Sequence, residues 1–415
     1  MGGKKRIGFV STRLAGTDGV SLETFKWFQV LQRNGYECYA FAGELATPAQ
    51  SSLLEPLAHF NHPEIAHLHQ QCFGAPTRSR EVSRRMQELK DHLKKRLYEF
   101  VTSFDIDILI PENALAIPMH IPLGLALTEF LAETGMPAVA HHHDFSWERD
   151  RFLVNGVHDY LQYAFPPSLP NIRHVVINSA ASRQLSFRRG ISNVVIPNVF
   201  DFNSPVQGGG AAGDLRRELD FKPDELMLLQ PTRIVPRKWI ERAVELASLL
   251  GGPRPRLVIS HESGDEGDLY VRRIQEFARR HEVELVLIGD MVGPLRSFGM
   301  SDGKKYCIGD AYQAADVVTY LSGYEGFGNA FIEAVYFKKP IVVNRYSIFV
   351  EDIEPCGFNA IAVDSFVSQG TVERLRAFLN DPALPELLEE NFRLGARYFS
   401  YEVLEAKLLP LIERF

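Results

Sequence analysis

The sequence contains few cysteines, no long apolar run and no excess of positive charge. Its four cysteines are scattered without a CxxC pair, which argues against a disulfide framework and against a cysteine zinc site. These are Cys38, Cys72, Cys307 and Cys356. We expect reduced thiols in a cytoplasmic protein. The 52 acidic and 45 basic side chains give a net charge of −7, whereas a broad nucleic-acid surface requires positive charge, so we expect no nucleic-acid partner.

The N-terminal segment carries no recognisable secretion or membrane signal. Its apolar residues 7–10 follow a short basic start and are too few for a signal peptide or a membrane span. We also find no strongly amphipathic segment of the kind that lies on membranes. We therefore expect no transmembrane segment and small, soluble substrates. Nothing in the sequence indicates an oligomeric state.

At 415 residues the chain exceeds one ordinary core, so two domains are expected. Short apolar runs alternate with longer amphipathic segments, which is typical of a parallel, doubly wound α/β sheet. The expected strands are 7–11, 37–41, 106–111, 138–141, 174–177 and 194–197, then 226–229, 256–260, 284–288, 317–321 and 340–343. The expected helices include 21–34, 83–104, 238–250, 269–281, 330–337 and 372–380. Because a connector with Pro and Gly at 204–213 interrupts the alternation, we predict two halves joined near residue 200.

The most informative segment is Tyr324–Ala334. Glu325 and Glu333 lie on either side of a turn that contains Gly-Phe-Gly, with an apolar strand before it and a helical run after it. Glycine lets the backbone approach a ligand closely, and the free N–H groups of a first helical turn can donate to hydroxyl or phosphate groups. We predict a polyol-and-anion binding corner, in which Glu325 accepts from sugar hydroxyls and Glu333 reaches a ribose.

A cluster of cations follows the first strand of the second half. Arg233 and Lys238 stand at a predicted helix start. They suit a diphosphate, because Arg binds phosphate oxygens bidentately and Lys supplies a compact charge. Arg237 is a further cation that could compete for this role. The alternative is a solvated helix start that carries a few positive charges.

Three histidines and an aspartate, His141 to Asp144, end an apolar strand. His and Asp are zinc ligands, but consecutive strand residues point to opposite faces, so the three histidines cannot easily converge. We therefore predict no metal site. If the pleat of the strand continues, His141 shares a face with His143. The alternative is a polar strand end packed against a loop.

The Tyr324–Ala334 segment resembles the signature of the retaining nucleotide-sugar glycosyltransferases of family 4. That resemblance is carried by four matching positions, Glu325, Phe327, Gly328 and Glu333, and by Arg233 and Lys238 upstream. It implies the GT-B fold, in which two doubly wound Rossmann-like domains face each other across a cleft and the C-terminal helix crosses back to the N-terminal domain. We accordingly expect an acceptor-binding domain at 1–200, completed by about 395–415, and a donor-binding domain at 201–394.

The resemblance also implies roles for individual residues. The catalytic set is Arg233, Lys238, Glu325 and His143, in which the cations offset charge on the leaving diphosphate and His143 faces the donor sugar without acting as a general base. The expected donor-binding residues are Gly19, Phe327, Gly328, Asn329, Ala330 and Glu333. The expected acceptor-side residues are Asp144, Asn113 and Arg13, together with the loop 111–120. Asp18 takes the place of a second glycine in the loop that contains Gly19.

The expected reaction moves a hexose from a nucleoside diphosphate sugar to a hydroxyl of a small acceptor, with retention of the anomeric configuration. GDP-mannose and UDP-glucose are the leading donors, and a sugar or a phosphorylated or carboxylated polyol is the favoured acceptor. No cofactor or metal is expected to be required. Two alternatives stay open from the sequence: a phosphorylase or epimerase on the same fold, and a non-catalytic nucleotide-sugar binding protein.

Overall fold

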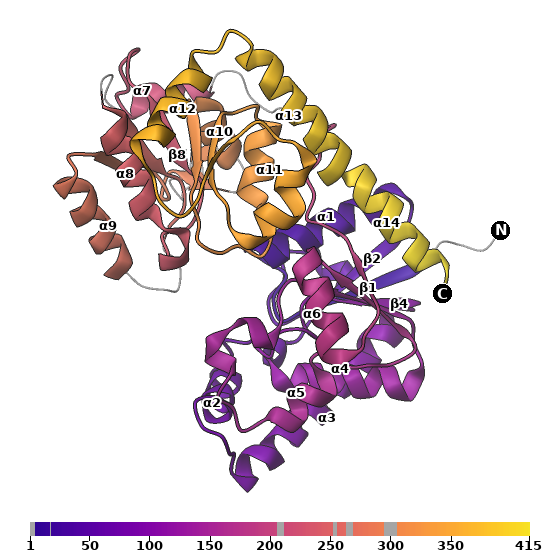
Figure 1. Ribbon diagram of the computed structural model, residues 1–415. Helices are drawn as coiled ribbons and strands as arrows, with labels where there is room; N and C mark the ends of the chain where they lie inside the picture. The colour runs from indigo at the N-terminus through magenta and orange to yellow at the C-terminus, as the bar shows by residue number, and fades with distance from the viewer. Residues whose placement is uncertain (1–4, 17, 206–210, 252–254, 263–268, 294–304) are drawn as a thin grey trace. The chain divides into compact units, whose positions relative to one another are not determined.

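The structure is a computed structural model that describes residues 5–16, 18–205, 211–251, 255–262, 269–293 and 305–415. Residues 206–210 of the expected connector lie outside the described residues. The chain divides into two compact units (Figure 1). The N-terminal unit contains Met1–Asn198 and Tyr401–Phe415, and the C-terminal unit contains Val199–Ser400. The boundary expected from the sequence is residue 200.

A seven-stranded parallel sheet forms the centre of the N-terminal unit, in the order β3-β2-β1-β4-β5-β6-β7. Its strands are β1 (Arg6–Val10), β2 (Glu37–Ala42), β3 (Ser52–Leu54), β4 (Ile108–Pro111), β5 (Ala138–His142), β6 (Ile172–Val176) and β7 (Asn193–Val195). The strand order changes direction between β1 and β4. In open α/β sheets, ligands bind beyond the carboxyl ends of the strands at such a switch point, so the loops after β1, β4 and β5 are the natural place for a site.

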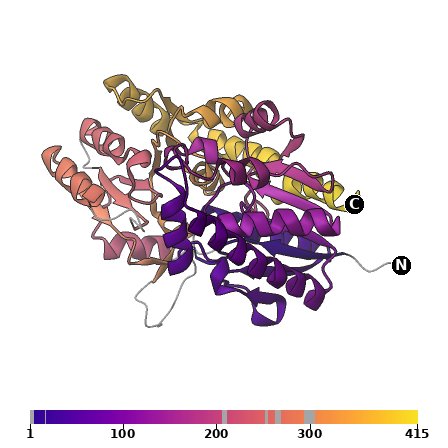
Figure 2. The ribbon, with the colours of Figure 1, turned by 90° about the horizontal axis from the view of Figure 1, so that it is seen from below.

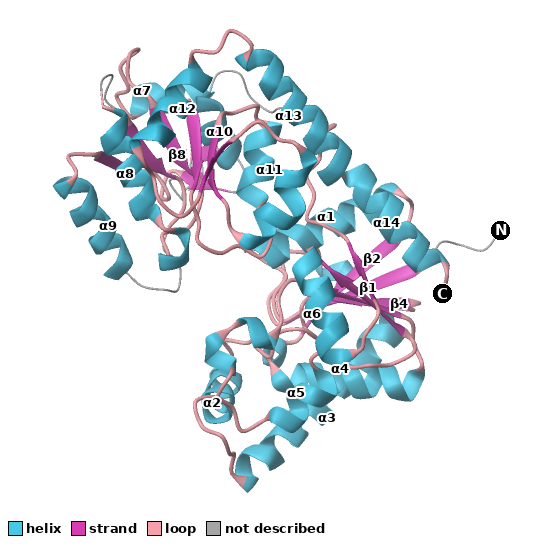
Figure 3. Ribbon diagram, in the orientation of Figure 1, coloured by secondary structure: helices cyan, strands magenta, loops and turns pink. Residues whose placement is uncertain are grey.

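Helices cover both faces of this sheet (Figure 3). On one face Phe28 stacks on Phe9 of β1, with ring centroids 4.1 Å apart. On the other face Val10 and Leu109 pack in a core cluster with apolar side chains from two helices. Phe9 and Val10 point to opposite faces of the sheet because successive side chains alternate along a strand. The helices are α1 (Gly19–Arg33), α2 (Pro63–Cys72), α3 (Arg80–Phe104), α4 (Ile121–Thr134), α5 (His158–Ala164), α6 (Ser179–Arg189) and α14 (Tyr401–Glu413).

The last helix of the chain, α14, packs on the N-terminal unit, where it lies beside α1 (Figures 1 and 2). Tyr401 donates through its hydroxyl to Gln29 of α1 at 2.8 Å. At the other end of α14, Lys5 Nζ donates to the carbonyl of Phe415 (3.0 Å) and Arg173 Nη1 to that of Leu411 (2.8 Å). Cations at a helix C-terminus donate to its free carbonyls and are attracted by the negative end of the helix dipole. The predicted crossing of the C-terminal helix to the N-terminal domain is confirmed.

The C-terminal unit contains a second parallel sheet of six strands, in the order β10-β9-β8-β13-β14-β15, and a two-stranded sheet of β11 and β12. The strands are β8 (Met227–Gln230), β9 (Arg256–Ile259), β10 (Glu284–Leu287), β11 (Val292–Gly293), β12 (Tyr306–Cys307), β13 (Val317–Tyr320), β14 (Ile341–Asn344) and β15 (Ile361–Val363). The helices are α7 (Ala211–Glu218), α8 (Ile240–Leu250), α9 (Leu269–Arg280), α10 (Ile308–Ala314), α11 (Asn329–Tyr336), α12 (Gln369–Leu379) and α13 (Leu384–Phe399).

The predicted pair of doubly wound α/β domains is confirmed, with differences in detail. The edge strands β3 and β15 were not predicted, because each has only three residues and is too short to show a period. The helix expected at 238–250 begins at Ile240, because Trp239 adopts a left-handed φ of 47°. A break at Ser400, in extended conformation, separates α13 from α14. Within the described residues no helix is both long enough and apolar enough to cross a membrane.

Candidate active site

The cation cluster of the C-terminal unit lies just beyond β8, on a loop whose start is fixed by buried hydrogen bonds. Gln230 Nε2 donates to Thr232 Oγ1 (2.8 Å), and Thr319 Oγ1 of β13 donates to Gln230 Oε1 (2.9 Å). The loop then closes in a 3₁₀ turn, Pro236–Lys238. In consequence the cations that follow β8 are held beside the end of β13.

Glu325 connects the end of β13 to these cations. Its carboxylate forms ion pairs with Lys238 through Oε1 and with Arg237 through Oε2, the latter at 2.9 Å. Arg237 Nη1 also donates to the carbonyl of Tyr324, and the Gly323 N–H donates to the carbonyl of Arg237 at 2.9 Å. Two motifs that are distant in sequence therefore form one structure. Lys238 and Glu325 were expected in one site, whereas the contact of Arg237 with the carboxylate was not predicted.

The charges in this cluster favour an anionic ligand. Burial on its own would raise the pKa of Glu325, but Lys238 and Arg237 outweigh it and hold the pKa below its usual value. The pKa of Lys238 is lowered by burial and by neighbouring guanidinium groups, against the attraction of Glu325. Two cations, Arg237 and Lys238, thus share one carboxylate, and a third, Arg233, lies near enough to lower the pKa of Lys238. Arg233 is exposed, which leaves its side chain accessible to a ligand.

The Gly-Phe-Gly turn after Glu325 is fixed by close packing. Tyr346 donates through its hydroxyl to the carbonyl of Phe327 at 2.7 Å, and the buried Phe327 ring packs edge-on against Phe399. A Cβ on Gly328 would lie 2.5 Å from the Tyr346 hydroxyl oxygen, so this position requires glycine. As the spacing predicts, α11 begins directly after it at Asn329. The free N–H groups at the start of this helix therefore follow directly on the loop that carries Glu325.

Glu333 lies in α11, where a buried phenol holds its carboxylate. Tyr312 of α10 donates through its hydroxyl to Glu333 Oε2 at 2.8 Å and lies 3.2 Å from the carbonyl oxygen of Ala330. Burial and the Glu333 carboxylate raise the pKa of Tyr312 well above its usual value, so it stays a donor. Tyr312 was not among the residues that the sequence analysis singled out, since a tyrosine in a helical run has no motif around it.

In the N-terminal unit, Asp18 caps α1. Its Oδ1 accepts from the backbone N–H groups of Val20 and Ser21, each at 3.1 Å, and its Oδ2 accepts from Arg13 Nη2 at 3.0 Å. Asp18, which stands where the family has a second glycine, therefore acts as the N-cap of α1. Gly19 opens the helix, and a Cβ at this position would meet nothing within 4 Å, so the space in front of it is open.

Asn113 ties the end of β4 to the end of β5. Its side-chain Oδ1 accepts from the backbone N–H of His143 (3.0 Å), and its Nδ2 donates to Asp144 Oδ1 (3.0 Å). Its own N–H donates to the carbonyl of His141 at 2.8 Å, while its φ is 56°. Asp144 is held further by Arg149, whose Nη2 lies 2.6 Å from Oδ2. The structure thus joins the predicted residues Asn113, His143 and Asp144 in one network.

Glu112, next to Asn113, belongs to the loop 111–120 expected on the acceptor side, but the sequence predicted no partner for its side chain. Its buried Oε2 lies 2.9 Å from His141 Nδ1 and 3.4 Å from His143 Nε2. His142 points away from Glu112, and its Nε2 lies 2.9 Å from His174 Nδ1. The expectation that His141 and His143 share a face is confirmed. The available signal was a carboxylate directly after a buried strand that neighbours a strand ending in His-His-His.

This buried cluster is electrostatically unusual. Burial raises the pKa of Glu112 and lowers that of His141 to about 3, and it also lowers the pKa of His143. The candidate ligand atoms of the three residues lie within 4.8 Å of one another, a grouping that could hold a metal ion. Of the three histidines only His142 points away from this grouping, and Glu112, which the sequence did not indicate as a ligand, provides its third side chain.

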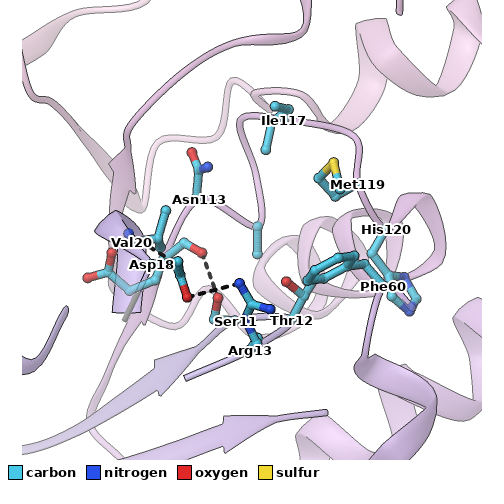
Figure 4. A pocket seen from close by; sticks show the side chains of 12 residues that line it. Ser11, Thr12, Arg13, Asp18, Val20, Phe60, Asn113, Ile117, Met119 and His120 are labelled. Carbon is cyan, nitrogen blue, oxygen red and sulfur yellow. Dashed lines mark hydrogen bonds and ion pairs between the residues drawn. The ribbon is translucent and has the colours of Figure 1, made fainter. Parts of the chain in front are cut away.

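A cavity of about 120 Å³ lies at the carboxyl ends of β1 and β4 (Figure 4). It brings together the predicted acceptor-side residues Arg13 and Asn113. Ile117 and Met119, from the loop after β4, lie across the cavity from Thr12 and Arg13. The lining residues are Ser11, Thr12, Arg13, Asp18, Val20, Phe60, Glu112, Asn113, Ala114, Ile117, Met119 and His120.

Comparison with solved structures defines the class of fold. A glycosyltransferase from Rickettsia africae matches 99% of this chain over 98% of its own length, with a TM-score of 0.71 at 14% sequence identity. The two parallel sheets are those of the GT-B glycosyltransferases, and the predicted fold class is thereby confirmed.

Sequence comparison defines the family. Residues 303–394, which include Glu325 and Glu333, match the family of glycosyl transferases group 1. The mannosylglucosylglycerate synthase of Thermotoga maritima is 32% identical over 96% of this chain and 98% of its own length. That of Petrotoga mobilis is 31% identical over 94% of this chain and 93% of its own. The chain belongs to the group 1 glycosyltransferases, as its resemblance to family 4 predicted, and it is an enzyme of that class.

Proposed function

We propose that the enzyme transfers a hexosyl group, with GDP-mannose as the first candidate donor and UDP-glucose as the second, to a hydroxyl of glucosylglycerate or a closely similar sugar acid. The names of the two relatives support mannose and this acceptor. Within the protein, the observation that carries the donor half is the Glu325 carboxylate held between Lys238 and Arg237, next to the start of α11.

In the proposed reaction the cations stabilise the leaving group. Lys238 and the exposed Arg233 bind the donor diphosphate, and their charge offsets the negative charge that develops as the bond from the sugar to phosphate breaks. Glu325 binds hydroxyls of the donor sugar, because a carboxylate keeps acceptor capacity beyond two ion pairs. Glu333 binds the ribose. Phe327 and Gly328 shape the turn, and the N–H groups of Asn329 and Ala330 donate to the donor.

We propose retention of the anomeric configuration and no requirement for a metal or cofactor. A new bond forms between the acceptor oxygen and the anomeric carbon on the face that the diphosphate leaves. The acceptor's proton passes to the leaving phosphate oxygen. His143 faces the donor sugar in this scheme, and Asn113 and Asp144 hold it in position. Gly19 provides open space for the donor. A cytoplasmic location is supported by four free cysteine thiols.

A product assay tests this proposal. The purified enzyme is incubated with glucosylglycerate and either GDP-mannose or UDP-glucose, with and without EDTA, and the product is analysed by NMR. We expect one glycoside with the anomeric configuration of the donor, formed faster from GDP-mannose and at the same rate with EDTA. An inverted product would overturn the retaining mechanism, and loss of activity with EDTA would overturn metal independence. Dependence of turnover on inorganic phosphate would indicate a phosphorylase.

A further inference from the structure

The cavity of the N-terminal unit contains a guanidinium with unused hydrogen-bond donors. Arg13 is the only lysine or arginine among the described residues that line it. Its Nη2 donates to Asp18 at 3.0 Å, and the described residues offer no partner to Nε or Nη1. The guanidinium lies over the face of Phe60, 5.3 Å from the ring centroid, which limits its movement. An arginine in this position is preorganised to bind an anion.

Asp18 does not fully offset the charge of Arg13. Its Oδ1 accepts from the N–H groups of Val20 and Ser21, and its Oδ2 accepts from the Ser21 hydroxyl at 2.8 Å as well as from Arg13. The carboxylate is thus shared with the positively polarised start of α1. Glu112, the other carboxylate that lines the cavity, is buried, and burial raises its pKa. This leaves the Arg13 guanidinium as the charged donor that a ligand in the cavity meets.

The rest of the cavity suits a small, partly apolar acid. Phe60, Ile117 and Met119 provide apolar walls, and the Thr12 hydroxyl, which has no partner among the described residues, provides a further polar contact. The volume of about 120 Å³ is several times the roughly 10–15 Å³ that one water requires. Asn113 is not a free contact, because both polar atoms of its side chain are engaged by His143 and Asp144.

We propose that this cavity is the carboxylate subsite of the acceptor, and that Arg13 distinguishes a carboxylated acceptor from a neutral polyol of the same shape. The inference rests on the proposed function, which names a sugar acid as the acceptor. It adds the group that is recognised and the residue that recognises it. A single guanidinium matches the charge of one carboxylate, whereas the three cations at 233–238 match a diphosphate.

Binding measurements with a matched pair of probes test this proposal. Glucosylglycerate and the neutral glucosylglycerol differ only in the carboxylate, and their Kd values are measured by calorimetry in the presence of GDP. The proteins are the wild type, Arg13→Gln, and Arg80→Gln as a control. Arg80 is an exposed arginine at the start of α3, so its loss makes the same change in net charge away from the cavity. The Kd for GDP alone is measured for each protein.

We expect the wild type and Arg80→Gln to bind glucosylglycerate at least tenfold more tightly than glucosylglycerol. Arg13→Gln should lose this preference while its Kd for GDP stays unchanged. Equal affinity of the wild type for the two probes, or an unchanged preference in Arg13→Gln, would overturn the carboxylate subsite. Weaker GDP binding in Arg13→Gln would instead assign Arg13 to the donor phosphates. If the preference is present but no glycoside forms, the subsite stands and the proposed function fails.

Discussion

Lys238 and Glu325 form a buried ion pair that joins the loop after β8 to the loop after β13. Loss of Glu325 leaves the buried Lys238 without an ionic partner among the described residues and should lower stability by about 3–5 kcal/mol. Loss of Lys238 should lower stability less, because Glu325 keeps its ion pair with Arg237. We expect Lys238→Met and Glu325→Gln each to lower the melting temperature and to reduce kcat by about 10²-fold or more. The double variant should recover much of the melting temperature and none of the activity. Recovery of turnover in the double variant would remove the pair from catalysis.

Arg233 and Arg237 should have separable roles. Arg233 is exposed, whereas Arg237 is tied to Glu325 and to the backbone of the β13 loop. Arg233→Ala should therefore reduce kcat by about 10²-fold with little change in melting temperature. Arg237→Ala should lower the melting temperature and raise the KM for the donor. Steady-state kinetics and thermal melts of the two variants check this, and reversed effects would show that Arg237 holds the diphosphate.

Gly328 should tolerate no side chain while Tyr346 is present. A Cβ at this position would lie 2.5 Å from the Tyr346 hydroxyl oxygen, and overpacking of this kind costs about 1–3 kcal/mol. The change Tyr346→Phe removes the clash together with the hydrogen bond to Phe327. We expect the free-energy losses of Gly328→Ala and Tyr346→Phe to add to more than the loss in the double variant. Gly19→Ala, where the space is open, is the control, and simple additivity would contradict this packing.

Stability should fall as the pH is lowered below 6.5, in part because of His120. This buried histidine accepts from the Leu123 N–H through Nδ1, and burial lowers its pKa from 6.5 to about 4. The unfolded chain binds its proton below pH 6.5 while the folded chain does not, so stability present above pH 6.5 is lost toward pH 4, by up to about 1.4 kcal/mol per pH unit.

Urea unfolding of wild type and His120→Asn at pH 7 and pH 5 checks this expectation. Asparagine can still cap α4 but has no proton to bind in this range, so the variant should lose less stability between the two pH values. His158→Asn, which changes an exposed histidine of the same unit, is the control. Equal losses in wild type and His120→Asn would show that His120 becomes protonated without unfolding.

The elements that could be predicted from the sequence are those with a local pattern. Buried parallel strands are near-continuous apolar runs, so β4, β5 and β13 were recognisable, and Gly-Phe-Gly before a helical run placed the start of α11. The ion pair of Glu325 with Arg237 could not be predicted, because the two residues meet only through the pairing of β8 with β13. Glu112 and Tyr312 are similar cases, since burial and partner depend on neighbouring elements and leave no local pattern.

The position of α14 has a consequence for how the protein is made. Residues 401–415 complete the first unit. Lys5 and Arg173 of that unit donate hydrogen bonds to carbonyls at the end of this segment. Synthesis proceeds from the N-terminus, and domains generally fold as units in that order. Here the sheet that is translated first is completed by residues 401–415, which follow the whole second unit, so the first unit cannot be complete before the second has been translated.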